Sequence, residues 1–106
     1  MPLMAGDFEV ITVSTVPIGF TASKLLPTTG QYKGNKAERV ECTLETDQIR
    51  FQKHIVANQT LSASVGHIKN VLDEWAEKGH ATLFNYRMIL AGSNDAHVTV
   101  TYYYQV

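Results

Sequence analysis

The sequence is poor in cysteine: Cys42 is the only one among 106 residues. A single cysteine excludes an intrachain disulfide and a cage of thiolates around a metal ion. Because Cys42 stands in an alternating apolar stretch, we expect it to be a small buried side chain. We also expect the chain to be made and to fold in a reducing cytoplasm, without a disulfide framework.

The sequence has no apolar run that approaches the length of a membrane helix, about 20 residues. Residues 1–6 lack the basic start and apolar stretch of a secretory signal. Neither charge is in excess, since 9 Lys and Arg face 10 Asp and Glu, for a net charge of −1. A nucleic-acid binder usually carries a basic patch, whereas acidic residues interrupt the cluster of Lys33, Lys36 and Arg39. We therefore expect no membrane partner and no nucleic-acid partner.

Catalytic and metal-binding motifs are also missing. The histidines His54, His67, His80 and His97 are 13, 13 and 17 residues apart, which is too far to place two metal ligands on one element. No serine stands in a nucleophile-elbow sequence, and the glycines have only the spacing of turns. We therefore expect a protein that is not an enzyme and that holds no metal and no cofactor.

The densest acidic cluster consists of Asp73, Glu74 and Glu77. Two carboxylates can perform general acid–base catalysis only in a cleft that raises the pKa of one of them. We interpret this cluster instead as a solvated face opposite Trp75.

The clearest positive signal is the alternation of residues 97–104. The even-numbered residues of this run, two valines and two tyrosines, fall on one face of an extended backbone, and Tyr103 falls on the other. A period of two predicts a β-strand with one apolar face. Similar or β-branched runs predict strands at residues 7–15, 18–22, 39–45, 48–52 and 84–90.

The connections between these runs predict how the strands pair. Residues 39–52 and residues 84–104 each contain two alternating runs with a short polar connection, so each predicts an antiparallel hairpin. Residues 26–36 and 57–66 are rich in turn-forming types and are predicted to be loops.

Residues 68–78 fit two structures. Ile68, Val71, Leu72 and Trp75 have the i, i+3, i+4, i+7 spacing of an amphipathic helix, and this pattern alone predicts a helix. The alternative is a short strand at residues 72–77.

Together these segments predict one domain, residues 1–106, of the all-β class. The predicted architecture is an antiparallel β-sandwich, for which the jelly-roll and the immunoglobulin-like type are both open, with about six to eight short strands and at most one short helix.

Exposed tyrosines give the candidate interaction site. Tyr32 stands beside Lys33 in a predicted loop, and Tyr103 points away from the apolar face of its strand. Tyrosine is favoured at protein interfaces and on sugar-binding surfaces because one end is apolar and the other polar. The candidate interface is therefore Tyr32, Lys33 and Tyr103. The alternative for Tyr103 is packing in a second layer or at the edge of the sandwich.

The order of the segments resembles a small β-sandwich family among the structural proteins of tailed-bacteriophage virions. The resemblance lies in Ile11-Thr12-Val13-Ser14 with residues 18–22, residues 40–46 running into Ile49-Arg50-Phe51, Ser64-Val65-Gly66-His67, and residues 84–89 with residues 96–102. These pieces cover most of the chain from about residue 8 onward. In such domains a turn and a short strand follow the Val-Gly-His segment, so the resemblance implies that residues 73–78 are extended.

The resemblance also implies a role in assembly, as a decoration, head-fibre or tail-accessory subunit of a virion that is made in the bacterial host cytoplasm. The implied partners are copies of the chain itself and major capsid or tail proteins. Near-neutral charge suits surfaces that become buried between subunits, where charged residues are depleted. The alternative function is a binding module for carbohydrate or protein.

Overall fold

The structure, a computed structural model, describes residues 2–53 and 61–105. Seven strands and two short helices follow one another in the described residues: β1 (Leu3–Val13), α1 (Ala22–Leu25), β2 (Ala37–Glu45), β3 (Ile49–Gln52), β4 (His67–Lys69), β5 (Glu74–Lys78), α2 (His80–Asn85), β6 (Arg87–Leu90) and β7 (Ala96–Gln105). Of the predicted loop at residues 57–66, positions 57–60 lie outside the described residues. The rest of that loop forms a turn between Ser62 and Val65.

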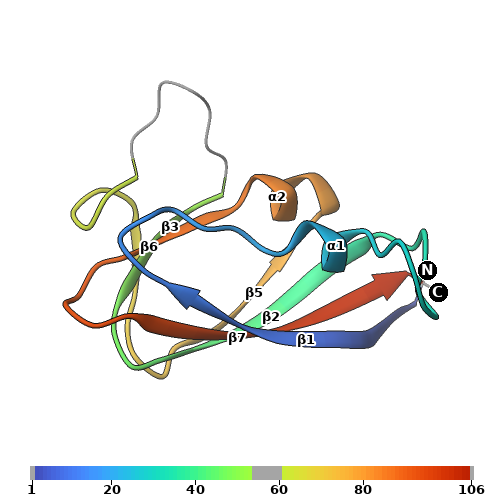
Figure 1. The fold of residues 1–106 in the computed structure, drawn as a ribbon, viewed down its shortest axis with the longest axis horizontal. Coiled ribbons are helices and arrows are strands. Elements are labelled where there is room, and N and C mark those ends of the chain that lie inside the picture. The colour runs from blue at the N-terminus through green and yellow to red at the C-terminus, as the bar shows by residue number, and fades with distance from the viewer. Residues whose placement is uncertain (1, 54–60, 106) are drawn as a thin grey trace.

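The strands form two antiparallel sheets, which confirms the predicted all-β, sandwich-like fold. The large sheet has the strand order β1-β7-β2-β5, and the small sheet has the order β4-β3-β6. Both helices lie on the same side of the large sheet, and the two ends of the chain lie close to one end of that sheet (Figure 1). The large sheet therefore has one face toward the core and one face toward solvent.

The core forms where the large sheet, the small sheet and the helices meet. Residues of β7 alternate between buried and half-buried along the whole strand, as the sequence predicted. The core side chains with no solvent exposure include Val13, Val40, Leu44, Val98, Val100 and Tyr102 of the large sheet, Ile49 and Met88 of the small sheet, and Leu25 and Leu83 of the helices. These buried side chains form a single cluster.

The two predicted hairpins are wrong. β2 belongs to the large sheet and β3 to the small sheet, and likewise β6 belongs to the small sheet and β7 to the large one. Each short connection therefore crosses from one sheet to the other and does not join paired strands. An alternating pattern shows which face of a strand is buried, and both sheets bury a face in the same core. The pattern therefore does not reveal the partner of a strand.

Residues 68–78 contain β4, a turn and β5, so the helix that the apolar spacing predicts is wrong and the extended reading of residues 73–78 is confirmed. Leu72 has a positive φ of 73°, in the left-handed region of backbone conformation, and a right-handed helix cannot contain that conformation. The N–H of Leu72 donates to the C=O of Leu44 at 2.8 Å, and the N–H of Leu44 donates to the C=O of Asp73 at 3.1 Å. These bonds hold the turn against the end of β2.

The structure has two short helices, one more than the sequence predicted. The predicted strand at residues 18–22 contributes only a single bridge from Ile18 to Met88, and α1 begins at Ala22. The predicted strand at residues 84–90 begins only at Arg87, because Phe84 lies within α2. The Leu83 N–H bonds to the C=O of Gly79 at 2.9 Å, so local helical bonding overrides the alternation of side chains there.

Candidate functional site

The solvent-facing side of the large sheet is the broadest regular surface of the fold. The strand registers place Phe8 beside Thr101 and Val10 beside Thr99, and they continue these rows to Glu41 and Thr43 on β2. We call this surface the outer face. It consists of Phe8, Val10 and Thr12 of β1, His97, Thr99, Thr101 and Tyr103 of β7, Arg39, Glu41, Thr43 and Glu45 of β2, and Glu74, Ala76 and Lys78 of β5.

Apolar and charged side chains occupy opposite edges of the outer face. Phe8 is 69% exposed and Val10 is 56% exposed, both on β1. Glu74 and Lys78 are exposed on β5, at the other edge. A charged edge discourages pairing with another chain, whereas an apolar edge favours it. The two edges of the large sheet therefore differ in their capacity to bind a partner.

Strand β1 is also the longest edge of the fold. Its 11 residues span about 36 Å at about 3.3 Å per residue, close to the 39 Å of the longest dimension of the molecule. Among the described strands, β1 pairs only with β7. A bulge at Gly6 interrupts the register between Ala5 and Asp7, and the register is regular from Asp7 to Val13. The regular part of this edge carries Phe8 and Val10, whereas the exposed Leu3 and Met4 lie before the bulge.

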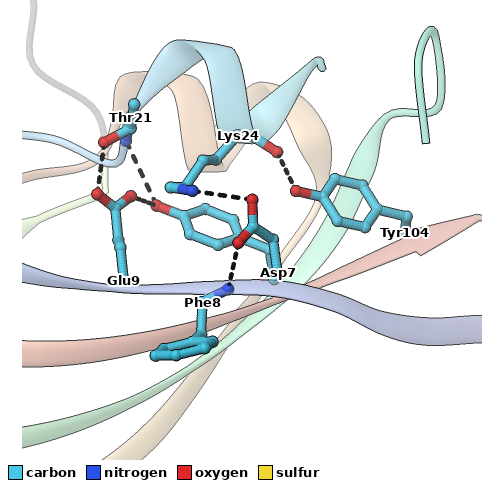
Figure 2. A network of polar contacts seen from close by, with 7 residues as sticks. Asp7, Phe8, Glu9, Thr21, Lys24 and Tyr104 are labelled. Atoms are coloured by element: carbon cyan, nitrogen blue, oxygen red, sulfur yellow. Dashed lines mark hydrogen bonds and ion pairs between the residues drawn. The ribbon is translucent and has the colours of Figure 1, made fainter. Parts of the chain in front are cut away.

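The acidic side chains of β1 point the other way, toward α1 (Figure 2). Lys24 Nζ lies 2.8 Å from Asp7 Oδ2, and this contact is both a hydrogen bond and an ion pair. The Lys24 ammonium lowers the pKa of the Asp7 carboxyl below its ordinary value through this bond. The negative charge of Asp7 is therefore compensated on the inner side of the strand.

Glu9 is held in the same way, by hydroxyl donors. Thr21 Oγ1 donates to Glu9 Oε1 at 2.8 Å, and the hydroxyl of Tyr102 donates to Glu9 Oε2. The hydroxyl of Tyr104 donates to the C=O of Lys24 at 2.6 Å (Figure 2). These bonds fix α1 and the segment before it onto β1 and β7. Sequence reasoning missed this network, because its members are distant in the chain and no local motif joins them.

The structure does not bring the three predicted interface residues together. The ring of Tyr32 stacks on that of Tyr104, with centroids 4.9 Å apart, on the core side of β7. Tyr103 lies on the outer face, where the Arg39 guanidinium is 5.3 Å from its ring centroid. A hydrogen bond to Glu41 raises the pKa of the Tyr103 hydroxyl. Lys33 is exposed in the turn after α1. Of the three, only Tyr103 belongs to the outer face.

A shallow hollow of about 380 Å³ lies in the outer face between β7, β2 and β5. Glu41 and Glu74 supply carboxylates to its lining, and Thr43, Thr99 and Thr101 supply hydroxyls. Such a lining offers hydrogen-bond acceptors and hydroxyl donors. The hollow therefore suits a polar ligand group. No local pattern in the sequence indicates it, because its lining comes from three strands that are distant in the chain.

The described histidines lie apart, each with its own neighbour. His80 Nδ1 is 3.0 Å from the C=O of Ala37, and His97 Nδ1 is 3.0 Å from Thr46 Oγ1. His67 packs on the ring of Phe51, and His54 lies outside the described residues. Within residues 2–53 and 61–105, no group of three or more His, Cys, Asp or Glu residues is placed to hold a metal ion.

The interpretation of Asp73, Glu74 and Glu77 as a solvated face is wrong for Glu77, which is buried. It is only 6% exposed, because β5 turns Trp75 and Glu77 to the inner side of the sheet. Lys53 Nζ lies 3.6 Å from its Oε1, and Trp75 Nε1 donates to the hydroxyl of Tyr86 at 3.1 Å. Burial, followed by the charge of Glu77, raises the pKa of the Tyr86 hydroxyl.

Cys42 is 2% exposed, which confirms that it is a small buried side chain.

Comparison with protein families, with curated proteins and with solved structures gave no match to this chain. No helix in the described part of the chain has the length and apolarity to cross a bilayer. What the chain does is therefore inferred from the surfaces of the fold and from the resemblance of its sequence segments.

Proposed function

We propose that this chain is a non-enzymatic structural subunit of a tailed-bacteriophage virion, which assembles with copies of itself or docks on a capsid or tail. The observation that carries the proposal is the regular edge at β1 with its exposed apolar side chains, which pairs only with β7 among the described strands, beside a broad outer face rich in threonine. A long apolar edge strand in a protein that remains unassembled promotes aggregation. A subunit that assembles buries that edge, and the sequence resemblance is what supports a tailed-phage virion as the particle in this proposal.

The energetics favour assembly in many copies. Burying the exposed parts of Phe8 and Val10 contributes on the order of 2–4 kcal/mol per copy. The loss of translational and rotational freedom on association costs about 4–15 kcal/mol. One such contact therefore gives weak binding, whereas many copies on a particle reinforce one another through high effective concentration. A weak edge in solution and a stable position on a particle agree with a decoration, fibre-base or accessory subunit.

The partners in this proposal are copies of the chain and major capsid or tail proteins, and its location is the virion, after synthesis in the host cytoplasm. No cofactor, nucleic acid or membrane takes part. The outer face supplies the contact area, and the bonds from Asp7 and Glu9 to the α1 region keep β1 in place on the sheet.

The test is co-purification with particles. Tailed particles are purified by density gradient from cells that carry the gene, and the chain is quantified by mass spectrometry against the major capsid and tail proteins. We expect the chain in the particle fractions, in a fixed multiple of a particle protein. Its presence only in particle-free fractions would overturn the proposal.

The hollow in the outer face favours a second candidate, a carbohydrate-binding module. Sugar hydroxyls could donate to Glu41 and Glu74 and could accept from the threonine hydroxyls. A glycan array with the unmodified chain and with Glu41→Gln separates the two candidates. Glycan binding that Glu41→Gln abolishes supports the module, and an array without signal eliminates it.

A further inference from the structure

We infer that two copies of this chain pair edge to edge through β1, antiparallel about a two-fold axis at Val10, so that their four-stranded large sheets form one continuous sheet. This inference rests on the self-assembly in the proposed function and names the surface that performs it.

Comparison of the sheet edges identifies β1 as the pairing edge. The other edge of the large sheet, β5, has five residues and exposes Glu74 and Lys78. The edges of the small sheet, β4 and β6, have three and four residues. Short and charged edges are the usual protection against pairing with another chain. Within the described residues, only β1 combines length with an uncharged outer side.

The charges of β1 explain why the partner is a second copy. The outer side of its regular part carries Phe8, Val10 and Thr12 and no charged residue. A two-fold interface uses the same patch on both subunits and needs a self-complementary surface. An apolar patch is self-complementary. A partner with a charged surface, in contrast, would have no opposite charge to pair with on this side of β1. Aromatic and β-branched side chains on neighbouring strands also stabilise each other.

The same charges select the register. Val10 is the central residue of the regular stretch from Asp7 to Val13. An axis at Val10 places Val10 opposite its counterpart and Phe8 opposite Thr12. On the inner side the same axis places Glu9 opposite Ile11 of the other copy. An axis at Glu9 would place two carboxylates directly opposite each other, which is destabilising.

Cysteine cross-linking tests both the edge and the register. Cβ atoms directly opposite on antiparallel strands lie about 4.5–5.5 Å apart, close to the distance that a disulfide spans. We expect Val10→Cys to form a covalent dimer on mild oxidation, and Phe8→Cys mixed with Thr12→Cys to form the mixed dimer. The matched control is Ala76→Cys, which is exposed on the outer face at the opposite edge. Cross-linking of Val10→Cys no faster than that of Ala76→Cys would overturn the inference.

Sedimentation of the full chain gives an independent measurement. We expect a reversible dimer at high micromolar concentration, and we expect Val10→Lys to weaken it at least tenfold while Ala76→Lys leaves it unchanged. Circular dichroism verifies that each variant is folded, and the cross-linking result decides the inference if Val10→Lys is not. A monomeric wild type, or a dimer that Val10→Lys does not weaken, would overturn edge pairing. Neither result affects co-purification with particles, so the failure of this inference and the failure of the proposed function are distinguishable.

Discussion

The carboxylate of Asp47 lies directly against Gly92, in the space that a Cβ at position 92 would occupy. Asp47 accepts hydrogen bonds from the backbone N–H of Gln48 at 2.7 Å, Ser93 at 2.9 Å and Asn94 at 2.8 Å. It therefore joins the two places where the chain crosses between the sheets, from β2 to β3 and from β6 to β7.

The first prediction concerns this contact. We expect Gly92→Ala to lower the free energy of unfolding by about 1–3 kcal/mol, since an added methyl group must displace the carboxylate or the backbone. The measurement is urea unfolding followed by circular dichroism. Gly30→Ala is a useful comparison, because a Cβ at Gly30 meets no atom within 4 Å and the change tests only the positive φ of 83°. Equal stability of Gly92→Ala and the wild type would contradict the prediction.

The second prediction is a loss of stability in acid. The bond from Lys24 lowers the pKa of Asp7, and backbone N–H donors, first that of Asn94, lower the pKa of Asp47, from an ordinary value of 3.8 in both cases. A carboxyl whose pKa is lower in the folded state stabilises the fold above its unfolded pKa, and this contribution is lost as the pH falls through the folded pKa. We therefore expect stability to decrease as the pH falls below about 4.

The variants Asp7→Asn and Asp47→Asn test which groups cause that decrease. Each should reduce the dependence of stability on pH in this range, measured as thermal unfolding between about pH 2 and pH 6. Asp95→Asn is the control, because Asp95 is an exposed carboxylate in the turn before β7. If the pH dependence survives in both test variants, other carboxylates are responsible.

The third prediction concerns the bulge in β1. A Cβ at Gly6 would lie 2.6 Å from Cε2 of Tyr32 and 2.7 Å from Cδ2 of Tyr104. We expect Gly6→Ala to destabilise the fold by about 1–3 kcal/mol, because the stacked rings of Tyr32 and Tyr104 must move away from the added methyl group. Combined with Tyr32→Ala, the change should be less harmful than in the wild-type background, since one of the crowded rings is then absent. Simple additivity in this double-mutant cycle would refute the explanation.

The fourth prediction concerns the network between β1 and α1. The Tyr102 side chain is buried, and its hydroxyl donates to Glu9. Tyr102→Phe removes a donor from a carboxylate and should lower stability by about 1.5–3 kcal/mol. Tyr103→Phe, at the neighbouring half-buried position, should change stability by at most about 0.5 kcal/mol. Comparable losses in the two variants would show that the Glu9 bond has no special role.

The sequence pattern predicted which residues of a strand are buried, but it did not predict which strands pair. The burial of alternate residues along β7, such as Val98 and Tyr102, followed directly from the two-residue period. The partner of each strand did not, because Ile49 and Leu44 are apolar for the same reason although they belong to different sheets. At Leu72 and Asp73, a positive φ of Leu72 and one backbone bond from each residue to Leu44 override a helical spacing. These are tertiary effects that a local pattern does not contain.

In the candidate site, too, the local orientation of a side chain was predictable and the long-range arrangement was not. The sequence showed that Tyr103 points away from the core, and it lies on the outer face. The separation of Tyr32 from Tyr103 was not predictable, since it depends on how the loop after α1 folds back onto Tyr104. The position of β1 at the edge of the described part of the large sheet depends on the whole strand order. Sequence alone predicted a strand there and gave no indication that it would be an edge.

The central position of β7 in the large sheet has a consequence for how the molecule forms. Both β1 and β2 pair with β7. Among the described strands, β1 therefore has no partner, and β2 has only β5, until residues 96–105 have left the ribosome. Pairing between segments distant in sequence is slow, because a long loop must close first. We expect nascent chains that end before β7 to remain unfolded, and the large sheet to form only after β7 has been synthesised.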